Sequence, residues 1–412
     1  MISFDRFQLD NGLKVLVHED ESTSMAVVNI LYDVGARDEQ PDKTGFAHLF
    51  EHLMFGGSVN IPEFDAPLER AGGHSNAFTN NDITNYYDVV PAINLETVFW
   101  LESDRMLSLA FGQESLDVQK NVVSEEFKQN YLNQPYGDAY LKLKPLAYKV
   151  HPYNWSTIGK ELSHIENASM EEVKDFFNHY YLPNNAIMAV AGNVKTVEVE
   201  KLVRKWFDPI PSRDVPVRDL PKEPEQQESR AQHVEADVPV DAIYKAYHMC
   251  ARMDKEFHTV DLMSDILSEG DSSRFYNELV KKQKVFSEID LFHFGSLDAG
   301  LLVVEGQLTK GITFEKADEA IDVELKKIQN ELIGDEELQK VKNRAESSLA
   351  FYEMSTLHRA QELAYFELLG NAEMMNTEME KYQKVTSSEV LEQSRLIFDP
   401  KNTSTLYYKS NN

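Results

Sequence analysis

The sequence predicts an α+β protein made of two homologous halves, each a mostly antiparallel sheet packed with helices. Segments rich in β-branched residues alternate with longer amphipathic segments in both halves of the 412 residues. Between the halves, positions 209–232 combine prolines with charged residues, which is typical of a linker. Four residues of the first half also recur in the second at one common offset: Ser169, Val173, Pro183 and Asn185 return as Thr386, Val390, Pro400 and Asn402.

The first half opens with an alternating apolar pattern around Asn11-Gly12, which predicts a β-hairpin over 4–18. β-branched residues predict a strand at 25–34, and a largely apolar segment that ends at Gly56-Gly57 predicts a helix at 44–55. Ser169 begins a capping-box pattern, which predicts a helix at 169–180. The other elements expected are helices at 62–71, 93–110, 114–132 and 195–206, strands at 76–79, 85–90 and 186–191, and a loop at 133–157.

The second half repeats this alternation of strands and helices. The domain boundaries that follow are a first domain at 1–212, a linker at 213–232 and a homologous second domain at 233–412. We expect strands at 243–250, 285–294, 300–308 and 403–408, and helices at 257–268, 273–283, 313–332, 335–368 and 386–397.

Composition is that of an ordinary soluble globular protein, with 42% hydrophobic and 27% charged residues. No apolar run approaches the length that crosses a bilayer, and the N-terminus lacks the basic start and apolar core of a signal peptide. Cys250 is the single cysteine, so neither an intrachain disulfide nor a cysteine metal cluster is expected. We therefore expect a cytoplasmic or periplasmic protein without a membrane span.

The net charge of −28 argues against nucleic acid as a partner, because phosphate binding needs a basic face. A well-solvated surface is the simplest interpretation of so many acidic residues. The alternative is an acidic chamber that favours basic peptides.

The segment His48-Leu49-Phe50-Glu51-His52 carries two imidazoles and a carboxylate among apolar neighbours. Positions i and i+4 share one face of a helix, so both rings project together and form half of a zinc site. Glu51 lies on the neighbouring side of the same turn, which suits a general base acting on a metal-activated water. Burying these groups without a partner would be costly, which favours a metal site over a structural helix with a polar side.

A catalytic zinc typically takes three protein ligands, so His48 and His52 need one more. Glu125 and Glu126 are the candidates, adjacent on the helix expected at 114–132 and about 100° apart around its axis. Their spacing alone does not choose between them.

The corresponding helix of the second half is expected to lack the metal. Aligning Gly270 with Gly56 places Leu262 and Ile266 where the two histidines stand in the first half. The second half therefore offers the same scaffold with apolar side chains in place of ligands.

Together these features resemble the family of pitrilysin, insulin-degrading enzyme and mitochondrial processing peptidase, whose His-x-x-Glu-His motif is an inverted zincin motif. The chain looks most like the shorter, two-domain bacterial members, and the resemblance spans nearly its whole length. It implies two halves that face each other around a chamber. The stretches that carry it, besides the motif, are 72–79, 122–126, 135–137, 181–186 and 272–275.

For the metal site, the resemblance implies Zn²⁺ held by His48, His52 and Glu126, since the family's third ligand stands at Glu126. Gln119, two turns earlier on the same helix, stands where many members have a glutamate that supports activity. As an amide, Gln119 can hydrogen-bond and orient a ligand, but it holds no negative charge.

For the substrate, the stretch from Gly73 to Thr79 resembles the family's substrate-binding edge strand. An exposed edge pairs with an extended peptide through main-chain hydrogen bonds that tolerate many sequences. The resemblance places Asn76 and Ala77 against the peptide backbone, and a turn-capping role for Asn76 is the alternative.

The chain departs from the family at an arginine and a tyrosine, seven residues apart in the second half, which hold substrate and stabilise the oxyanion. Val280 and Ser287 occupy these two places, and neither can do the job. Lys281, Lys282 or Tyr276 are weak substitutes. Since some members work as two unlike subunits, a homologous partner chain in a heterodimer is expected to supply the pair, with a homodimer as the other possibility.

The sequence therefore predicts a zinc metalloendopeptidase that cleaves peptides or unfolded segments, as the zinc-bearing subunit of a dimer. The alternative is a non-catalytic peptide-binding or assembly subunit of the same fold. A maturation factor that cuts one precursor is a third interpretation, which differs from the first in substrate range.

Overall fold

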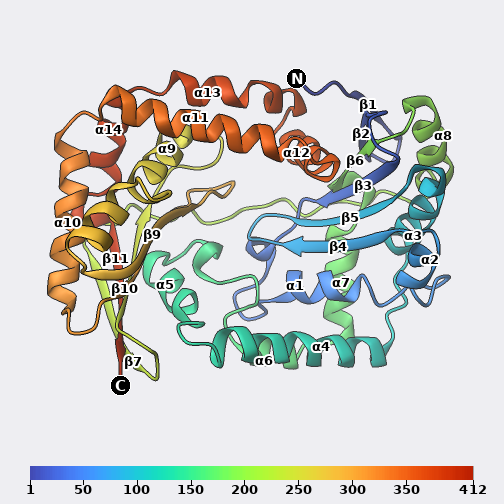
Figure 1. Cartoon of the computed structure of the whole chain (residues 1–412). Helices are drawn as coiled ribbons and strands as arrows, with labels where there is room; N and C mark the ends of the chain where they lie inside the picture. The colour runs from blue at the N-terminus through green and yellow to red at the C-terminus, as the bar shows by residue number, and fades with distance from the viewer. Residues whose placement is uncertain (412) are drawn as a thin grey trace. The chain divides into compact units, whose positions relative to one another are not determined.

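Each unit of the protein is a β-sheet covered by helices, as a computed structural model shows for residues 1–411 (Figure 1). The first unit combines Met1–Phe127, Trp155–Leu220 and Ala350–Thr377. The second combines Lys128–Asn154, Pro221–Leu349 and the chain from Glu378 onward. These compact units interleave along the chain, whereas the boundaries expected at 1–212, 213–232 and 233–412 are a prediction about the two homologous halves of the sequence.

The first sheet has the strand order β1-β2-β6-β3-β5-β4. Its neighbouring strands are antiparallel, except β2 and β6, which run parallel. β4 lies at one edge, in a register that places Thr79 opposite Thr84 of β5. The strands are β1 (Asp5–Gln8), β2 (Lys14–Glu19), β3 (Met25–Tyr32), β4 (His74–Thr79), β5 (Thr84–Pro91) and β6 (Ala186–Gly192).

The second sheet repeats the first. Its order β7-β11-β8-β10-β9 corresponds to β2-β6-β3-β5-β4, and its parallel pair, β7 with β11, takes the place of β2 with β6. The predicted fold class, two homologous halves with mostly antiparallel sheets, is therefore confirmed. The strands are β7 (Arg230–Ala236), β8 (Ala242–His248), β9 (Phe286–Phe294), β10 (Leu301–Leu308) and β11 (Thr403–Ser410).

Most of the helices lie close to the expected ranges. Those of the first unit are α1 (Phe46–Leu53), α2 (Asp65–Arg70), α3 (Leu95–Leu107), α4 (Gln113–Phe127), α6 (Leu162–Glu166), α7 (Met170–Tyr180), α8 (Thr196–Phe207) and α12 (Thr356–Leu368). The second unit holds α5 (Ala139–Ala147), α9 (Phe257–Ser268), α10 (Phe314–Asn330), most of α11 (Asp335–Tyr352), α13 (Glu378–Lys384), α14 (Ser387–Ile397) and two π-helical segments, Lys128–Leu132 and Tyr276–Lys282. Within the described part of the chain, no helix is both long and apolar enough to cross a membrane.

The duplication extends to single side chains. Ser169 and Thr386 open α7 and α14 with complete capping boxes. After each helix an asparagine, Asn185 or Asn402, donates at 2.9 Å to the carbonyl oxygen of the helix's last residue. Repeated sequence at these positions therefore builds the same local structure twice.

The helix expected at 335–368 is in fact two helices, because the chain turns after α11 and Ser355 caps a new helix. This second helix, α12, packs on the first sheet, on the side opposite α1, α4 and α7 (Figure 1). Ala360, Leu363 and Ala364 are buried there in one apolar core with side chains of β2, β3 and β6. This packing explains why part of the second half belongs to the first unit.

A helix that the sequence analysis missed, α5, covers the second sheet in the corresponding way. It lies in the segment 133–157, expected to be a loop, and contains Pro145, which obscures a helical pattern. Ala139, Leu143 and Ala147 are buried in a core with residues of β8 and β11. Packing on the sheet, which local sequence does not report, stabilises this helix.

The linker expected at 213–232 ends in a strand that the sequence analysis also missed. β7 begins at Arg230 and pairs parallel with β11 along its length. Its polar residues gave no strand pattern, since this strand lies at the edge of its sheet. Residues 211–229 form neither helix nor strand, as expected of a linker.

Shortening a buried side chain of α12 should destabilise the first unit. Leu363→Ala removes a fully buried side chain between α12 and the sheet, and such changes cost about 2–5 kcal/mol of unfolding free energy. Leu107→Ala is the matched control in the same unit, because that leucine is 43% exposed and should lose far less. Urea unfolding followed by circular dichroism measures both, and equal losses would contradict the packing described.

Candidate metal centre

The motif helix α1 presents two histidines because its opposite side is buried. The Phe50 ring packs 4.3 Å from the Tyr181 ring, centroid to centroid, and Phe50 is 1% exposed. His48 and His52 project from the other side, with ring centroids 4.8 Å apart. Burial of the apolar residues thus orients the imidazoles, as the motif's spacing predicts.

The start of α1 is held by a buried carboxylate. Oxygens of Glu39 accept hydrogen bonds from the N–H groups of Gly45 at 2.9 Å and Ala47 at 2.8 Å, and from the indole N–H of Trp155 at 3.0 Å. Gly45 has φ +88°, and a Cβ there would stand 2.7 Å from the carbonyl oxygen of Ile158. Glu39 therefore satisfies helix-terminal donors at a turn that is tight enough to require glycine at position 45.

Sequence reasoning missed Glu39 because a loop separates it from α1, and the known capping patterns do not extend so far before a helix. Burial raises the pKa of this carboxyl to about 8, and the three N–H donors oppose the shift. The residue is a fixed part of the site's support.

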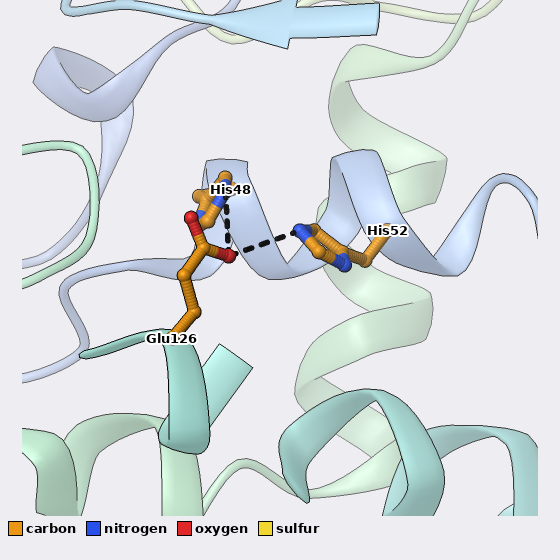
Figure 2. A group of neighbouring side chains, drawn as sticks. All are labelled: His48, His52 and Glu126. Carbon is orange, nitrogen blue, oxygen red and sulfur yellow. Dashed lines mark ion pairs between the residues drawn. The ribbon is translucent and has the colours of Figure 1, made fainter. Parts of the chain in front are cut away.

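A carboxylate from α4 completes the cluster (Figure 2). Oε2 of Glu126 lies 3.8 Å from Nε2 of His48 and 3.6 Å from Nε2 of His52. Candidate ligand atoms of these three residues all lie within 4.8 Å of one another. The structure thus brings together the three predicted ligands, while Glu125 lies exposed on the next side of α4.

This cluster has the chemistry and size of a zinc site. Tetrahedral ligands at about 2.0–2.1 Å from zinc stand about 3.3 Å from one another, close to the spacing seen here. Burial and the neighbouring His52 ring lower the pKa of His48 to about 4, so His48 is neutral, as a ligand must be. Within residues 1–411, Nε2 of His48 faces Glu126, while its Nδ1 is buried without a hydrogen-bond partner.

Glu51 lies beside this cluster and is held by a strand. The hydroxyl of Thr79, the last residue of β4, donates to Oε2 of Glu51 at 2.6 Å. Burial raises the pKa of Glu51, as does the charge of Glu126, while the Thr79 hydrogen bond and His52 lower it. A carboxylate with its pKa moved toward neutrality suits proton transfer. Thr79 is a second residue that the sequence analysis did not single out.

The predicted substrate-binding residues lie on an edge strand, as the family resemblance requires. Asn76 is exposed on β4, and its side-chain oxygen accepts from the N–H of Ala77 at 2.8 Å. That N–H therefore points away from β5, toward the open edge of the sheet. Gln119 is partly exposed on α4, two turns before Glu126.

The two positions where the family's arginine and tyrosine are expected have structural surroundings of their own. Val280 packs against the core of the second unit. The Ser287 hydroxyl donates to Gln307 O at 3.1 Å. Nearby, Lys282 pairs with Glu278, and Lys281 lies over the Tyr276 ring, 4.6 Å from its centroid.

Comparison with known proteins assigns the family. Residues 14–158 match the model described as Insulinase (Peptidase family M16), and residues 167–345 match Peptidase M16 inactive domain. The zinc protease PqqE of Helicobacter pylori is 33% identical over 340 residues, which cover 81% of this chain and 76% of that protein. The chain belongs to peptidase family M16. The predicted kinship with insulin-degrading enzyme and mitochondrial processing peptidase is thereby confirmed.

Two further similar proteins extend this comparison. The crystal structure of a protease from H. pylori has a TM-score of 0.94 and 28% identity, covering 99% of this chain and 100% of that one. The probable mitochondrial-processing peptidase subunit beta of Arabidopsis thaliana is 23% identical over 367 residues, covering 86% of this chain and 68% of that protein. All three residues of the cluster lie in the range matched by the first M16 model, before the inactive-domain match begins.

Removing the support of α1 should loosen the cluster. Glu39→Ala leaves buried N–H donors of Gly45 and Ala47 unsatisfied, at about 1–3 kcal/mol each. Glu39→Gln, which keeps one accepting oxygen, should lose less. Urea unfolding of the metal-free proteins gives the unfolding free energies, and a Glu39→Ala protein as stable as wild type would contradict the capping role.

Neighbouring glutamates on α4 should differ in their effect on zinc. Glu126→Gln replaces a charged ligand atom by a neutral one, and we expect zinc affinity to fall roughly 100-fold or more, beyond the typical loss from an outer hydrogen bond. Glu125→Gln makes the same charge change on the exposed side of the helix and should leave affinity unchanged. Equilibrium dialysis of chelator-stripped protein against buffered zinc measures both, and equal losses would contradict the assigned ligand set.

Proposed function

We propose that this M16 protein is a zinc-dependent endopeptidase that cleaves peptides or unfolded segments. The observation that carries the proposal is the convergence of His48, His52 and Glu126, with the Glu51 carboxylate beside them. Relatives named zinc protease support the choice of metal. Zn²⁺ fits because two imidazoles and one carboxylate leave a position open for substrate or water.

In this proposal the metal and the surrounding side chains have separate roles in the reaction. Bound zinc would polarise the scissile carbonyl and lower the pKa of a water molecule. His48, His52 and Glu126 would hold the ion in a fixed orientation. Glu51 would accept a proton from the attacking water and return it to the leaving amine.

Strand β4 would position the substrate. A peptide carbonyl that approaches the open edge of the sheet would replace the side-chain oxygen of Asn76 at the Ala77 N–H. Asn76 is exposed, so its side chain is free to turn toward the peptide backbone. Main-chain pairing of this kind requires an extended segment, which peptides and unfolded segments readily provide.

The oxyanion would need help from outside this chain. Val280 and Ser287 carry no charge and no phenol, and each is occupied within its own unit. We infer that a homologous partner subunit supplies an arginine and a tyrosine. A relative named as subunit beta of the mitochondrial-processing peptidase supports an assembly of two unlike chains, and a homodimer is the simpler arrangement.

The apolar and small side chains of Val280 and Ser287, in place of an arginine and a tyrosine, favour a second candidate. That candidate is a non-catalytic peptide-binding or assembly subunit. That role predicts damaged ligands, whereas the three ligand residues and Glu51 are all present. The endopeptidase is therefore the better proposal, and peptide cleavage decides between the two.

The zinc-loaded protein should cleave unstructured peptides once the homologous partner is present. Glu51→Gln should lower kcat by roughly 100-fold or more, because it removes the proton acceptor while the zinc content stays the same. Fluorogenic peptides report the rates, and mass spectrometry of the intact protein reports the metal.

Both outcomes with the pure chain are informative. Cleavage by the chain alone, lost in Glu51→Gln, would support the peptidase and remove the need for a partner. Zinc-loaded protein that binds peptide but cleaves nothing, with or without the partner, would contradict the endopeptidase and favour the binding role.

A further inference from the structure

A hydroxyl group connects the candidate peptide-binding strand to the candidate base. Thr79 Oγ1 lies 2.6 Å from Oε2 of Glu51, a distance typical of a strong hydrogen bond to a charged carboxylate. Thr79 is in β4, two residues after Ala77 and thus on the same face of the strand. The strand and α1, which are far apart in sequence, are joined at this atom pair.

In that hydrogen bond Thr79 is the donor, because an ionised carboxylate only accepts, and the competing acceptor is Thr84, opposite Thr79 on β5. Thr84 is fully buried, and its hydroxyl donates to the carbonyl oxygen of Val34 at 3.0 Å. Thr84 can therefore only accept from Thr79, and at 3.4 Å that contact is much weaker than the 2.6 Å bond to Glu51. The one proton of the Thr79 hydroxyl is left for Glu51.

We propose that Thr79 is a positioning residue for Glu51. Its hydroxyl holds one carboxylate oxygen against β4, so that the other oxygen faces the attacking water. This inference rests on the proposed peptidase function and deepens it, because the base is then oriented by the same strand that pairs with the peptide.

The rotamer preferences of the two side chains suit Thr79 to orienting Glu51. A β-branched side chain in a strand has few rotamers, so Thr79 offers its oxygen in a defined direction. Glu51 has flexible torsions that an unpaired carboxylate would sample, and orientation within a fraction of an ångström matters for proton transfer. The contact therefore supplies order where the base needs it.

Two nearly isosteric variants separate the hydroxyl from the shape of the side chain. Thr79→Val keeps the branched shape and removes the donor, and we expect kcat to fall roughly 10- to 100-fold with KM changed less than about threefold. Thr79→Ser keeps the donor and should recover most of kcat. Zinc content, measured in parallel, should be the same in all three proteins. A raised KM at unchanged kcat, or a Ser variant as slow as the Val variant, would overturn the proposal.

A second measurement needs no activity. In metal-free protein, Thr79→Val should lower the melting temperature more than Thr79→Ser does, and that difference should vanish in a Glu51→Ala background. A difference that persists without Glu51 would show that the hydroxyl acts elsewhere and would overturn the proposal. Absence of cleavage by the wild-type protein and its partner would instead refute the peptidase, whereas normal kcat in Thr79→Val refutes only the positioning role.

Discussion

The site depends on the way α1 is held, because a helix of eight residues is not stable on its own. Burial of Phe50 against Tyr181 fixes one side of the helix, and the Glu39 carboxylate fixes its first turn. With those contacts in place, the remaining side can carry imidazoles that have no structural use. The buried side that contains Phe50 and the side that carries His48 and His52 thus lie on opposite faces of the same short helix.

The chain's path ties this centre to the second sheet through covalent continuity. Glu126 is the next-to-last residue of α4, and the chain leaves the first unit directly after that helix. It returns at Trp155, whose indole N–H bonds to Glu39. The segment between carries α5, which is buried on the second sheet. Both ends of this segment are therefore anchored at the candidate metal centre, one beside the candidate ligand Glu126 and one at the support of α1.

The sequence predicted what depends on local periodicity and missed what depends on tertiary packing. His48 and His52 share a face at any i, i+4 spacing, so their convergence needed no structure. Glu125 and Glu126 could not be separated from their spacing, because only the orientation of α4 decides which one faces the histidines. Glu39 and Thr79 reach the site across a loop and a strand pairing, neither of which leaves a pattern. In the same way, nothing local in α5 or α12 indicates which sheet will bury it.

The duplication shows how one scaffold serves two purposes. α9 is the counterpart of α1, and Leu262 and Ile266, where the histidines would stand, are fully buried in the core of the second unit. Val280 likewise packs against that core, at the position where the family resemblance predicts an arginine. The second half therefore uses for packing the positions that could have served chemistry. A charged side chain at Val280 would be costly to pack against that core, which supports the proposal that another chain supplies the cation.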